Sequence, residues 1–239
     1  MPCILAIETS AHVGAVAILR GQRCDTVLAS AWVRDEQKLS AWVLPAIERV
    51  MTVAGLKPAN IDAIAFGAGP GSFTGVRTAC ATAQSLAYAW KRPLITVDSL
   101  EALAEMSSAS STCVVLDARM REVFSASFAR QPDGELARVS ATAVSAPDAV
   151  VVPADSGLIG SGVNLMPAQT TFGLDRTAQA EAGWAHGVAR VAVRKLARDE
   201  ITDPMYAEPI YVRNNVALTE AERQQALLTD KLPAGETVI

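Results

Sequence analysis

The segment DAIAFGAGPGSFTGVR, residues 62–77, carries the clearest structural signal in the chain. It begins with a short apolar run that is typical of a buried strand, and it continues into a loop rich in glycine. Residues 76–90 then have helical composition. A strand, a glycine-rich loop and a helix in this order predict an α/β fold.

The glycine-rich loop differs from the standard nucleotide motifs. A Walker loop requires Lys and then Ser or Thr after its last glycine, where this chain has Val76 and Arg77, and Ser72 replaces the third glycine of GxGxxG. Two interpretations stay open: backbone N–H groups that bind an anion, or a tight turn in which Ser72 or Thr74 caps the helix. The candidate residues of the loop are Gly69, Gly71, Ser72, Thr74 and Gly75.

Strand and helix patterns extend outward from this unit in both directions. Before it, three strand-like runs predict an antiparallel meander, and a helical pattern follows; after it come a short strand and a short helix. These elements are expected at residues 3–8, 14–19, 26–33, 37–54, 94–97 and 100–106.

A serine-rich break at residues 107–111 predicts a boundary between two lobes. The strand pattern recurs after it, at 112–117, 122–129 and 136–140, and a strand at 158–159 and a helix at 178–198 follow. We therefore expect a mixed-sheet α/β protein with an N-terminal lobe of residues 1–106. Residues 107–239 are expected to form the second lobe and an irregular tail.

Acidic residues occupy equivalent positions in the two meanders, each at the end of the first strand. Glu8 precedes Thr9 and Ser10, and Asp117 precedes Arg119 by two residues. In a duplicated nucleotide-clamping fold the two turns face each other, so these five residues are a candidate nucleotide or partner cleft. The alternative is that each carboxylate caps its own turn or pairs with an arginine such as Arg119.

The helix after the glycine-rich loop has small residues at four-residue spacing, which allow another element to pack closely. Packing on the chain's own sheet and packing on a partner helix both fit this pattern. The candidate interface residues are Val76, Ala79, Cys80, Ala83 and Ala87.

Composition limits the classes of function. The net charge of −4 provides no overall positive field for nucleic acid. A local exception is the arginine stripe, which a helix would align on one face and which we interpret as a solvated surface. It consists of His186, Arg190, Arg194 and Arg198.

Metal and hydrolase chemistry have little support in the sequence. The two histidines, His12 and His186, are far apart, so no metal site is predicted, and the GxSxG motif of serine hydrolases is absent. Four separated cysteines suit a reducing compartment. Because the N-terminus lacks a signal-peptide pattern and no later run has the length of a membrane helix, a cytoplasmic location without membrane association is expected.

Five blocks together resemble the TsaB family and follow one another in family order. They are ILAIETS at 4–10, DAIAFGAGPGSFTGVR at 62–77, VLDARMREVF at 115–124, LIGSGV at 158–163 and AEPIYVRNNVA at 207–217. The resemblance implies an actin-like fold of two RNase H-like lobes. It also implies a role in making threonylcarbamoyladenosine next to the anticodon of tRNA.

The same resemblance implies a non-catalytic subunit that binds a TsaD-like transferase, which a TsaE-like ATPase joins. Under this hypothesis the chain has no cofactor of its own, ATP is used by the complex, tRNA is contacted only indirectly, and a homodimer is possible. The alternatives are a stand-alone nucleotide-binding regulator and a degenerate metallopeptidase-like or ATPase enzyme of the actin-like fold. Two departures stand out: residues 35–38 lack a histidine that family members often carry, and the tail after Asn215 diverges from a short basic ending.

Overall fold

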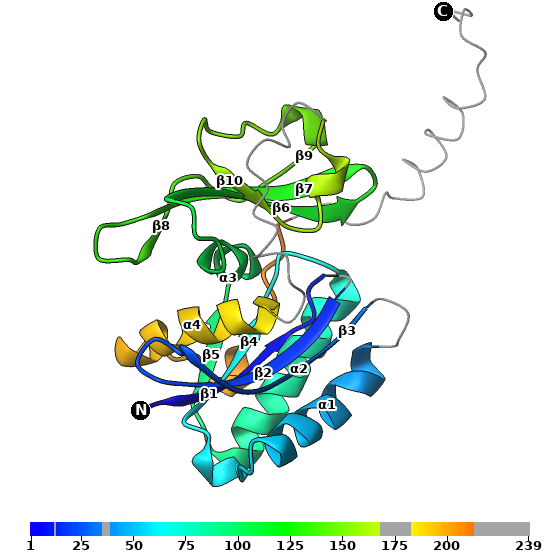
Figure 1. The fold of residues 1–239 in the computed structure, drawn as a ribbon. Helices are drawn as coiled ribbons and strands as arrows, with labels where there is room; N and C mark the ends of the chain where they lie inside the picture. The colour runs from blue at the N-terminus through cyan, green and yellow to red at the C-terminus, as the bar shows by residue number, and fades with distance from the viewer. Residues whose placement is uncertain (12, 35–38, 168–182, 213–239) are drawn as a thin grey trace, which may run out of the picture.

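The computed structural model describes residues 1–11, 13–34, 39–167 and 183–212. The expectations for His12, for residues 35–38 and for the tail after Asn215 lie outside these ranges. Two sheets are stacked with helices between them and on one outer face (Figure 1). None of the described helices has the length and apolar character needed to cross a membrane.

The first sheet has the strand order β3-β2-β1-β4-β5. Strand β1 is antiparallel to β2 and parallel to β4. The predicted meander and the two later strands are all present, with small changes at their ends. Their bounds are β1 (Cys3–Glu8), β2 (Val13–Arg20), β3 (Thr26–Arg34), β4 (Ala63–Gly67) and β5 (Leu94–Val97).

The second sheet repeats the first in a shorter form. Strand β6 is antiparallel to β7 and parallel to β10, as β1 is to β2 and β4, while β8 and β9 both pair with β7. This repeat confirms the predicted actin-like architecture of two RNase H-like lobes. The bounds are β6 (Ser111–Arg119), β7 (Glu122–Arg130), β8 (Leu136–Arg138), β9 (Ala143–Ser145) and β10 (Gly157–Ile159).

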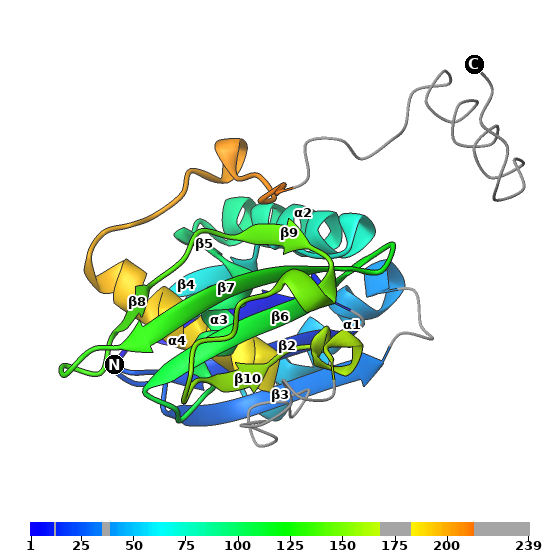
Figure 2. The same cartoon turned by 90° about the horizontal axis from the view of Figure 1, so that it is seen from above.

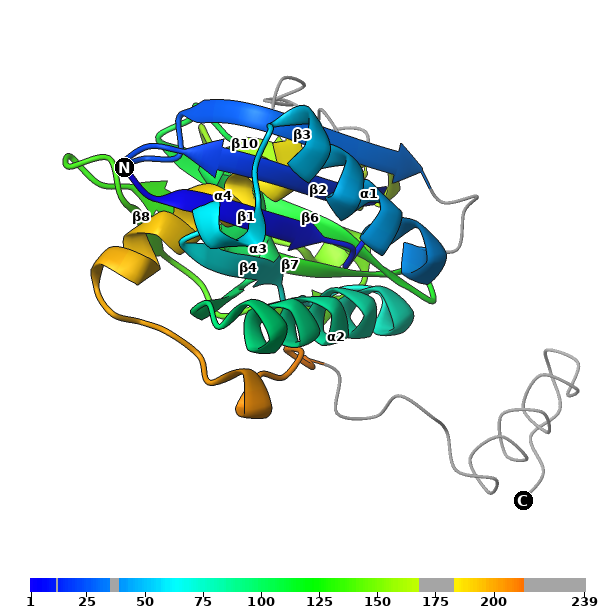
Figure 3. The same ribbon diagram turned by 90° about the horizontal axis from the view of Figure 1, so that it is seen from below.

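Helices cover both faces of the first sheet. Helices α1 (Leu39–Val53) and α2 (Phe73–Trp90) pack on its outer face, and α3 (Ser99–Glu105) and α4 (Gly183–Ala197) lie between the sheets (Figures 1 and 3). Alternate side chains of β1 enter two cores, because successive residues of a strand point to opposite faces. Leu5 belongs to the core under α1 and α2, whereas Ala6 belongs to the core that α3 and α4 share with the second sheet.

The chain does not divide as simply as the boundary at residue 106 suggests. The change of sheet does fall at this point, between α3 and β6. However, α4 returns to the first lobe and packs on β1 and β2, and its apolar face fills the core between the sheets. The assignment of all of residues 107–239 to the second lobe is therefore corrected, because α4 covers the inner face of the first sheet.

Residues 201–212, which we call the strap, also return to the first lobe (Figure 2). Thr202 forms a bridge with Leu94 at the sheet edge, and the Gln84 amide donates to the carbonyl oxygens of Pro204 and Ala207 at 2.8 and 3.1 Å. The Ile210 N–H donates to the Ala68 carbonyl at 2.7 Å. The strap thus lies along α2 and ends beside the glycine-rich loop.

Candidate functional site at the cleft between the lobes

A cavity of about 430 Å³ opens between the two lobes. The first lobe contributes Ser10, Gly71 and Ser72, and the second contributes Asp117 and Arg119. The structure therefore brings these sequence-predicted residues to one place. The other members of the two predicted sets, Glu8, Thr9, Gly69, Thr74 and Gly75, do not line the cavity.

Glu8 is sealed beneath the cleft rather than presented to it. Its side chain is 1% exposed, one carboxylate oxygen accepts from the Ser10 N–H at 2.6 Å, and the other accepts from the Ser99 hydroxyl at 2.8 Å. Burial raises the pKa of the Glu8 carboxyl, and the hydrogen bonds oppose this shift only in part. Both oxygens hold the protein together, so the turn-capping alternative describes Glu8 in this structure.

The glycine-rich loop packs directly on the turn that follows β1. A Cβ at Gly75 would lie 1.8 Å from the Thr9 carbonyl oxygen, and one at Gly71 would lie 2.1 Å from the Ser10 carbonyl oxygen. The Thr9 hydroxyl donates to the Gly75 carbonyl at 2.7 Å, and the Ser72 N–H donates to the Ser10 carbonyl at 2.5 Å. The glycines thus permit close backbone contact within the protein.

Ser72 caps α2, as one of the two interpretations of the loop predicts. Its hydroxyl accepts from the Gly75 N–H at 3.4 Å, and the helix begins at Phe73, three residues earlier than its composition suggests. The Gly69 N–H donates to the Ser99 hydroxyl at 3.1 Å. Several polar groups that could cradle a phosphate are therefore already bonded to the chain itself.

The Ser10 hydroxyl is an exception to this internal pairing. Ser10 is fully buried and lines the cavity, and its side-chain oxygen makes no hydrogen bond of good geometry to any residue that the structure describes. A buried hydroxyl that lacks a partner is unfavourable, so this oxygen is a point where a ligand or water would gain a bond.

On the opposite wall, Asp117 folds onto its own hairpin. Its carboxylate accepts from the Arg119 N–H at 2.7 Å and lies 3.6 Å from the Arg119 guanidinium, while its own N–H donates to the Ser161 hydroxyl at 3.1 Å. Arg119, Met120 and Arg121 all have positive φ, between 54° and 63°. The alternative in which Asp117 caps its turn and pairs with Arg119 is the arrangement observed.

The small-residue ridge of α2 faces the protein's own sheet. Its members are 0 to 4% exposed. All except Val76, which lines the cavity, pack in the core on the outer face of the first sheet, so they are not available to a partner. The interface prediction for Val76, Ala79, Cys80, Ala83 and Ala87 is therefore wrong. Internal packing, the other interpretation of the spacing, is correct because small residues let α2 lie close to the strands.

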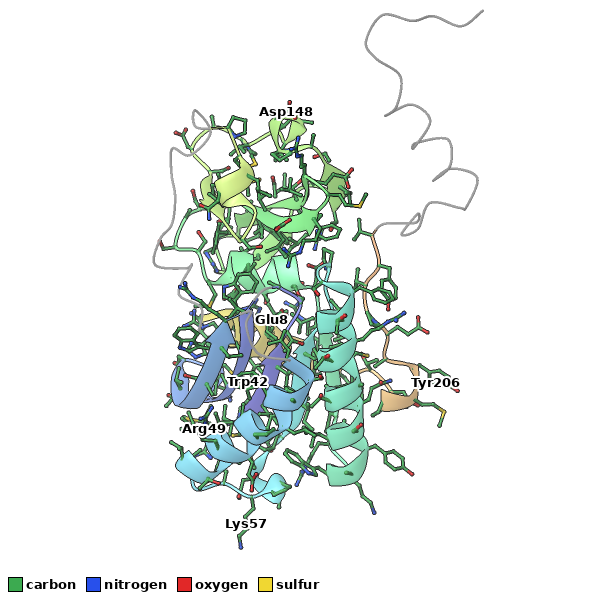
Figure 4. The ribbon with its side chains drawn as sticks, turned by 90° about the vertical axis from the view of Figure 1, so that its right-hand side faces the viewer. Glu8, Trp42, Arg49, Lys57, Asp148 and Tyr206 are labelled. Atoms are coloured by element: carbon green, nitrogen blue, oxygen red, sulfur yellow. The ribbon has the colours of Figure 1, made fainter. Side chains whose placement is uncertain are left out.

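The outward face of α2 instead carries features that the sequence reasoning missed. The Arg77 guanidinium lies 3.6 Å from the Phe73 ring centroid and donates to the Tyr211 hydroxyl at 2.9 Å, which fixes the end of the strap. A groove beside this cluster is lined by Ser40, Phe73, Thr74, Arg77, Thr78, Ala81 and Thr82. Phe73 and Tyr211 are each about half exposed. Figure 4 shows the strap, with Tyr206, beside α2.

Sequence spacing gave no signal for this cluster because Tyr211 lies far from α2 along the chain. Ser161 and Tyr211 did fall within the quoted blocks, without an assigned role. Among the residues that the structure describes, no three His, Cys, Asp or Glu side chains are grouped as metal ligands.

Comparisons with known proteins identify chains that are similar to this one. Residues 35–199 match the family model described as TsaD, tRNA N6-adenosine threonylcarbamoyltransferase. The tRNA threonylcarbamoyladenosine biosynthesis protein TsaB of Escherichia coli is 28% identical over 225 residues, which cover 90% of this chain and 96% of that protein. The Haemophilus influenzae protein of the same name is 37% identical over 54% of each chain.

Among solved structures, YeaZ from Pseudomonas aeruginosa is 32% identical, with a TM-score of 0.75 over 89% of this chain and all of that one. A second structure from that organism, with a TM-score of 0.74 and 31% identity, is described as an uncharacterized protein with similarity to peptidase YEAZ. Both likenesses extend through the two lobes that form the cleft.

Proposed function

Because the chain belongs to the TsaB family, we propose that it takes part in the biosynthesis of threonylcarbamoyladenosine in tRNA, as a non-catalytic subunit that binds and supports a TsaD-like transferase. A TsaE-like ATPase joins the pair, and the ATP that the complex uses is not turned over by this chain.

The observation that carries the non-catalytic part of this proposal is the packing at the end of β1. In a nucleotide-clamping fold this turn must offer free backbone and carboxylate groups to phosphate or a cation. Here Glu8 is 1% exposed with both oxygens bonded, and the glycine-rich loop fills the space above Thr9 and Ser10. These contacts favour a structural role for the turn.

The groove on the outward face of α2 is the surface that we propose for the partner. The half-exposed Phe73 lines this groove, and two further large apolar side chains are exposed on the same pair of helices: Leu44 of α1 is 54% exposed and Tyr88 of α2 is 81% exposed. Apolar side chains gathered on an exposed surface are typical of a protein interface, and aromatic residues and arginine often dominate its binding energy. The partner surface is therefore assigned to the solvent side of α2 and not to its buried ridge.

Reconstitution tests this function. A mixture of TsaD-like, TsaE-like and carbamoyl-adenylate-forming proteins, with tRNA and ATP, is expected to form threonylcarbamoyladenosine only when this chain is added. Mass spectrometry of the digested nucleosides gives the yield. Equal yields with and without the chain, or unchanged threonylcarbamoyladenosine in cells depleted of it, would refute the proposal.

A further inference from the structure

Two arginines of the stripe, Arg194 in α4 and Arg198 just after it, form ion pairs with α3 and with the second lobe. The Arg194 guanidinium donates to the Glu105 carboxylate of α3 at 2.9 Å, and Arg198 pairs with Glu135 in the turn between β7 and β8. One turn earlier, Arg190 contacts the Met106 sulfur. Burial lowers the pKa of the partly buried His186, and the nearby positive charge of Arg190 lowers it further. The interpretation of this stripe as a solvated face is therefore wrong for His186, Arg190 and Arg194, which are partly buried, whereas Arg198 is exposed.

Glu105 connects three elements through one carboxylate. Besides Arg194 of α4, it pairs at 3.7 Å with Arg130 at the end of β7, and its side chain is only 9% exposed. Arg130 also donates to the carbonyl oxygen of Ser107 at 3.1 Å, in the segment that joins the lobes. A carboxylate shared by two guanidiniums and shielded from water interacts more strongly than an exposed surface pair.

A second ionic contact joins the lobes at the other end of α3. Arg138 of β8 donates to Asp98 at 2.7 Å and stacks on Phe128, with 4.7 Å between guanidinium carbon and ring centroid. The other oxygen of Asp98 caps α3 by accepting from the Leu100 N–H at 2.7 Å. Because α3 is thus bonded to β7 and β8, its position fixes the second sheet relative to the first.

The contacts of Glu105 lie far from the cavity along the second sheet, whereas Asp98 precedes Ser99, which is bonded to Glu8 beneath the cleft. Arg130 follows Ala129, which pairs with Ser111 at the start of β6, whereas Asp117 of the cavity is near the end of β6. The first crossing between the lobes, from α3 to β6, lies at the same end as Glu105. Ion pairs beside the crossing point restrict rigid-body rotation of the second sheet relative to the first.

We propose that the ion pairs of Glu105 with Arg130 and Arg194, of Asp98 with Arg138, and of Glu135 with Arg198 form an interlobe clasp. The clasp holds the lobes at one angle and keeps the Ser10 end of the cleft closed. The continuous core of α3, α4 and both sheets provides the apolar part of the same restraint. This property belongs to the isolated chain and does not depend on the proposed function.

The test uses a thiol placed at Ser10 as a reporter of cleft opening. The four native cysteines are buried, and burial raises the pKa of Cys24 to about 12, so their background reaction with a thiol reagent is slow. Ser10→Cys is nearly isosteric and places the sulfur where the unpartnered hydroxyl lies. The rate of its modification by a disulfide reagent is measured in this background alone and together with Glu105→Gln, which removes two ion pairs.

We expect Glu105→Gln to accelerate modification of the thiol at position 10 about tenfold, while Cys113, buried in the second sheet, reacts at its unchanged slow rate. Glu48→Gln on α1, the same substitution at an exposed glutamate remote from α3, is the matched control and is expected to leave both rates unchanged. Salt near 1 M, which reduces the Debye length to about 3 Å, is expected to act in the same direction as Glu105→Gln in the parent protein.

Equal rates of thiol modification at position 10 in the parent and Glu105→Gln proteins would refute the proposed clasp. Parallel acceleration of position 10 and Cys113 would overturn it too, because it would show unfolding instead of rotation of one lobe. If Glu105→Gln does not fold by circular dichroism, Arg198→Gln decides the question. Its pair with Glu135 is half exposed, so an acceleration of about threefold at position 10 alone is expected, and none would refute the proposal.

Discussion

The Ser99 hydroxyl donates a 2.8 Å hydrogen bond to the Glu8 carboxylate, which joins the start of α3 to the end of β1 beneath the cleft. The same hydroxyl accepts from the Gly69 N–H of the glycine-rich loop at 3.1 Å. Glu8, Ser99 and Gly69 therefore form one buried polar network, and the charge of Glu8 is its least favourable component because it is removed from water.

Glu8 predicts a specific pH dependence of stability. Its pKa is raised in the folded protein, so between the unfolded and the folded pKa the folded state binds a proton that the unfolded state does not. The stability that Glu8 contributes is fully present below its pKa in the unfolded chain, and it is lost as the pH rises through its higher pKa in the folded protein. Glu8→Gln removes the charge, so we expect its melting temperature relative to the wild type to increase as the pH is raised from 5 to 8.

Calorimetric or circular-dichroism melting of both proteins over this range gives the difference directly. Glu48→Gln, a change at an exposed glutamate of α1, serves as the control and is expected to show no such trend. A melting difference between Glu8→Gln and the wild type that stays constant with pH would show that the Glu8 carboxyl is not destabilised by burial.

Gly75→Ala tests the contact between the loop and the turn after β1. Alanine is normally preferred over glycine within a helix by about 1 kcal/mol, so the change would be stabilising if the space were open. The added Cβ would lie 1.8 Å from the Thr9 carbonyl, and we expect instead a loss of about 3 kcal/mol in the free energy of unfolding. Urea titration measures it, with Thr74→Ala at an exposed neighbouring position as the control.

Much of the fold is encoded in local patterns. The run from Cys3 to Glu8 forms β1 at its predicted bounds, and α3 is capped by Asp98, which lies beside it in the sequence. These features depend on residues near one another in sequence, where strand patterning and capping chemistry act.

Local sequence patterns did not predict which neighbour covers each face of a helix. The spacing of Ala79 and Ala83 predicts a close-packed ridge, but whether a sheet or a partner covers it depends on where α2 meets β4. Likewise, the spacing of Arg194 and Arg198 predicts one basic face, but Glu105 and Glu135 are brought to it only by the tertiary fold. The cleft residues Ser10 and Asp117 could be matched in advance because the two meanders repeat.

The packing of the cleft predicts that the isolated protein binds ATP poorly. With Mg²⁺ present, calorimetric titration is expected to give a dissociation constant weaker than about 1 mM, which corresponds to roughly −4 kcal/mol. The reason is that Glu8 and the glycine-rich loop are bonded within the chain. Saturable binding in the micromolar range would favour the stand-alone nucleotide-binding regulator, and the TsaE-like ATPase under identical conditions is the positive control.

Three arginine substitutions along α2 separate folding from partner binding. Ala83 is fully buried against the first sheet, so Ala83→Arg forces a long charged side chain into the core and is expected to cost about 4 kcal/mol or more of stability. Ala81 is exposed and lines the groove, so Ala81→Arg is expected to retain the wild-type melting temperature. Its long side chain would fill the groove, and affinity for the TsaD-like partner is expected to fall at least about tenfold, as for other residues at the centre of an interface.

Ala89→Arg is the matched control, because Ala89 is also exposed on α2 but does not line the groove. It introduces the same charge into the same helix, so any effect that it shares with Ala81→Arg reflects charge and not position. Affinity is measured by calorimetry with the partner, and the yield of threonylcarbamoyladenosine is measured in the reconstituted mixture. If Ala81→Arg binds as tightly as Ala89→Arg, the groove is not the partner surface. Loss of binding in both proteins would indicate that charge repulsion, and not the shape of the groove, decides the association.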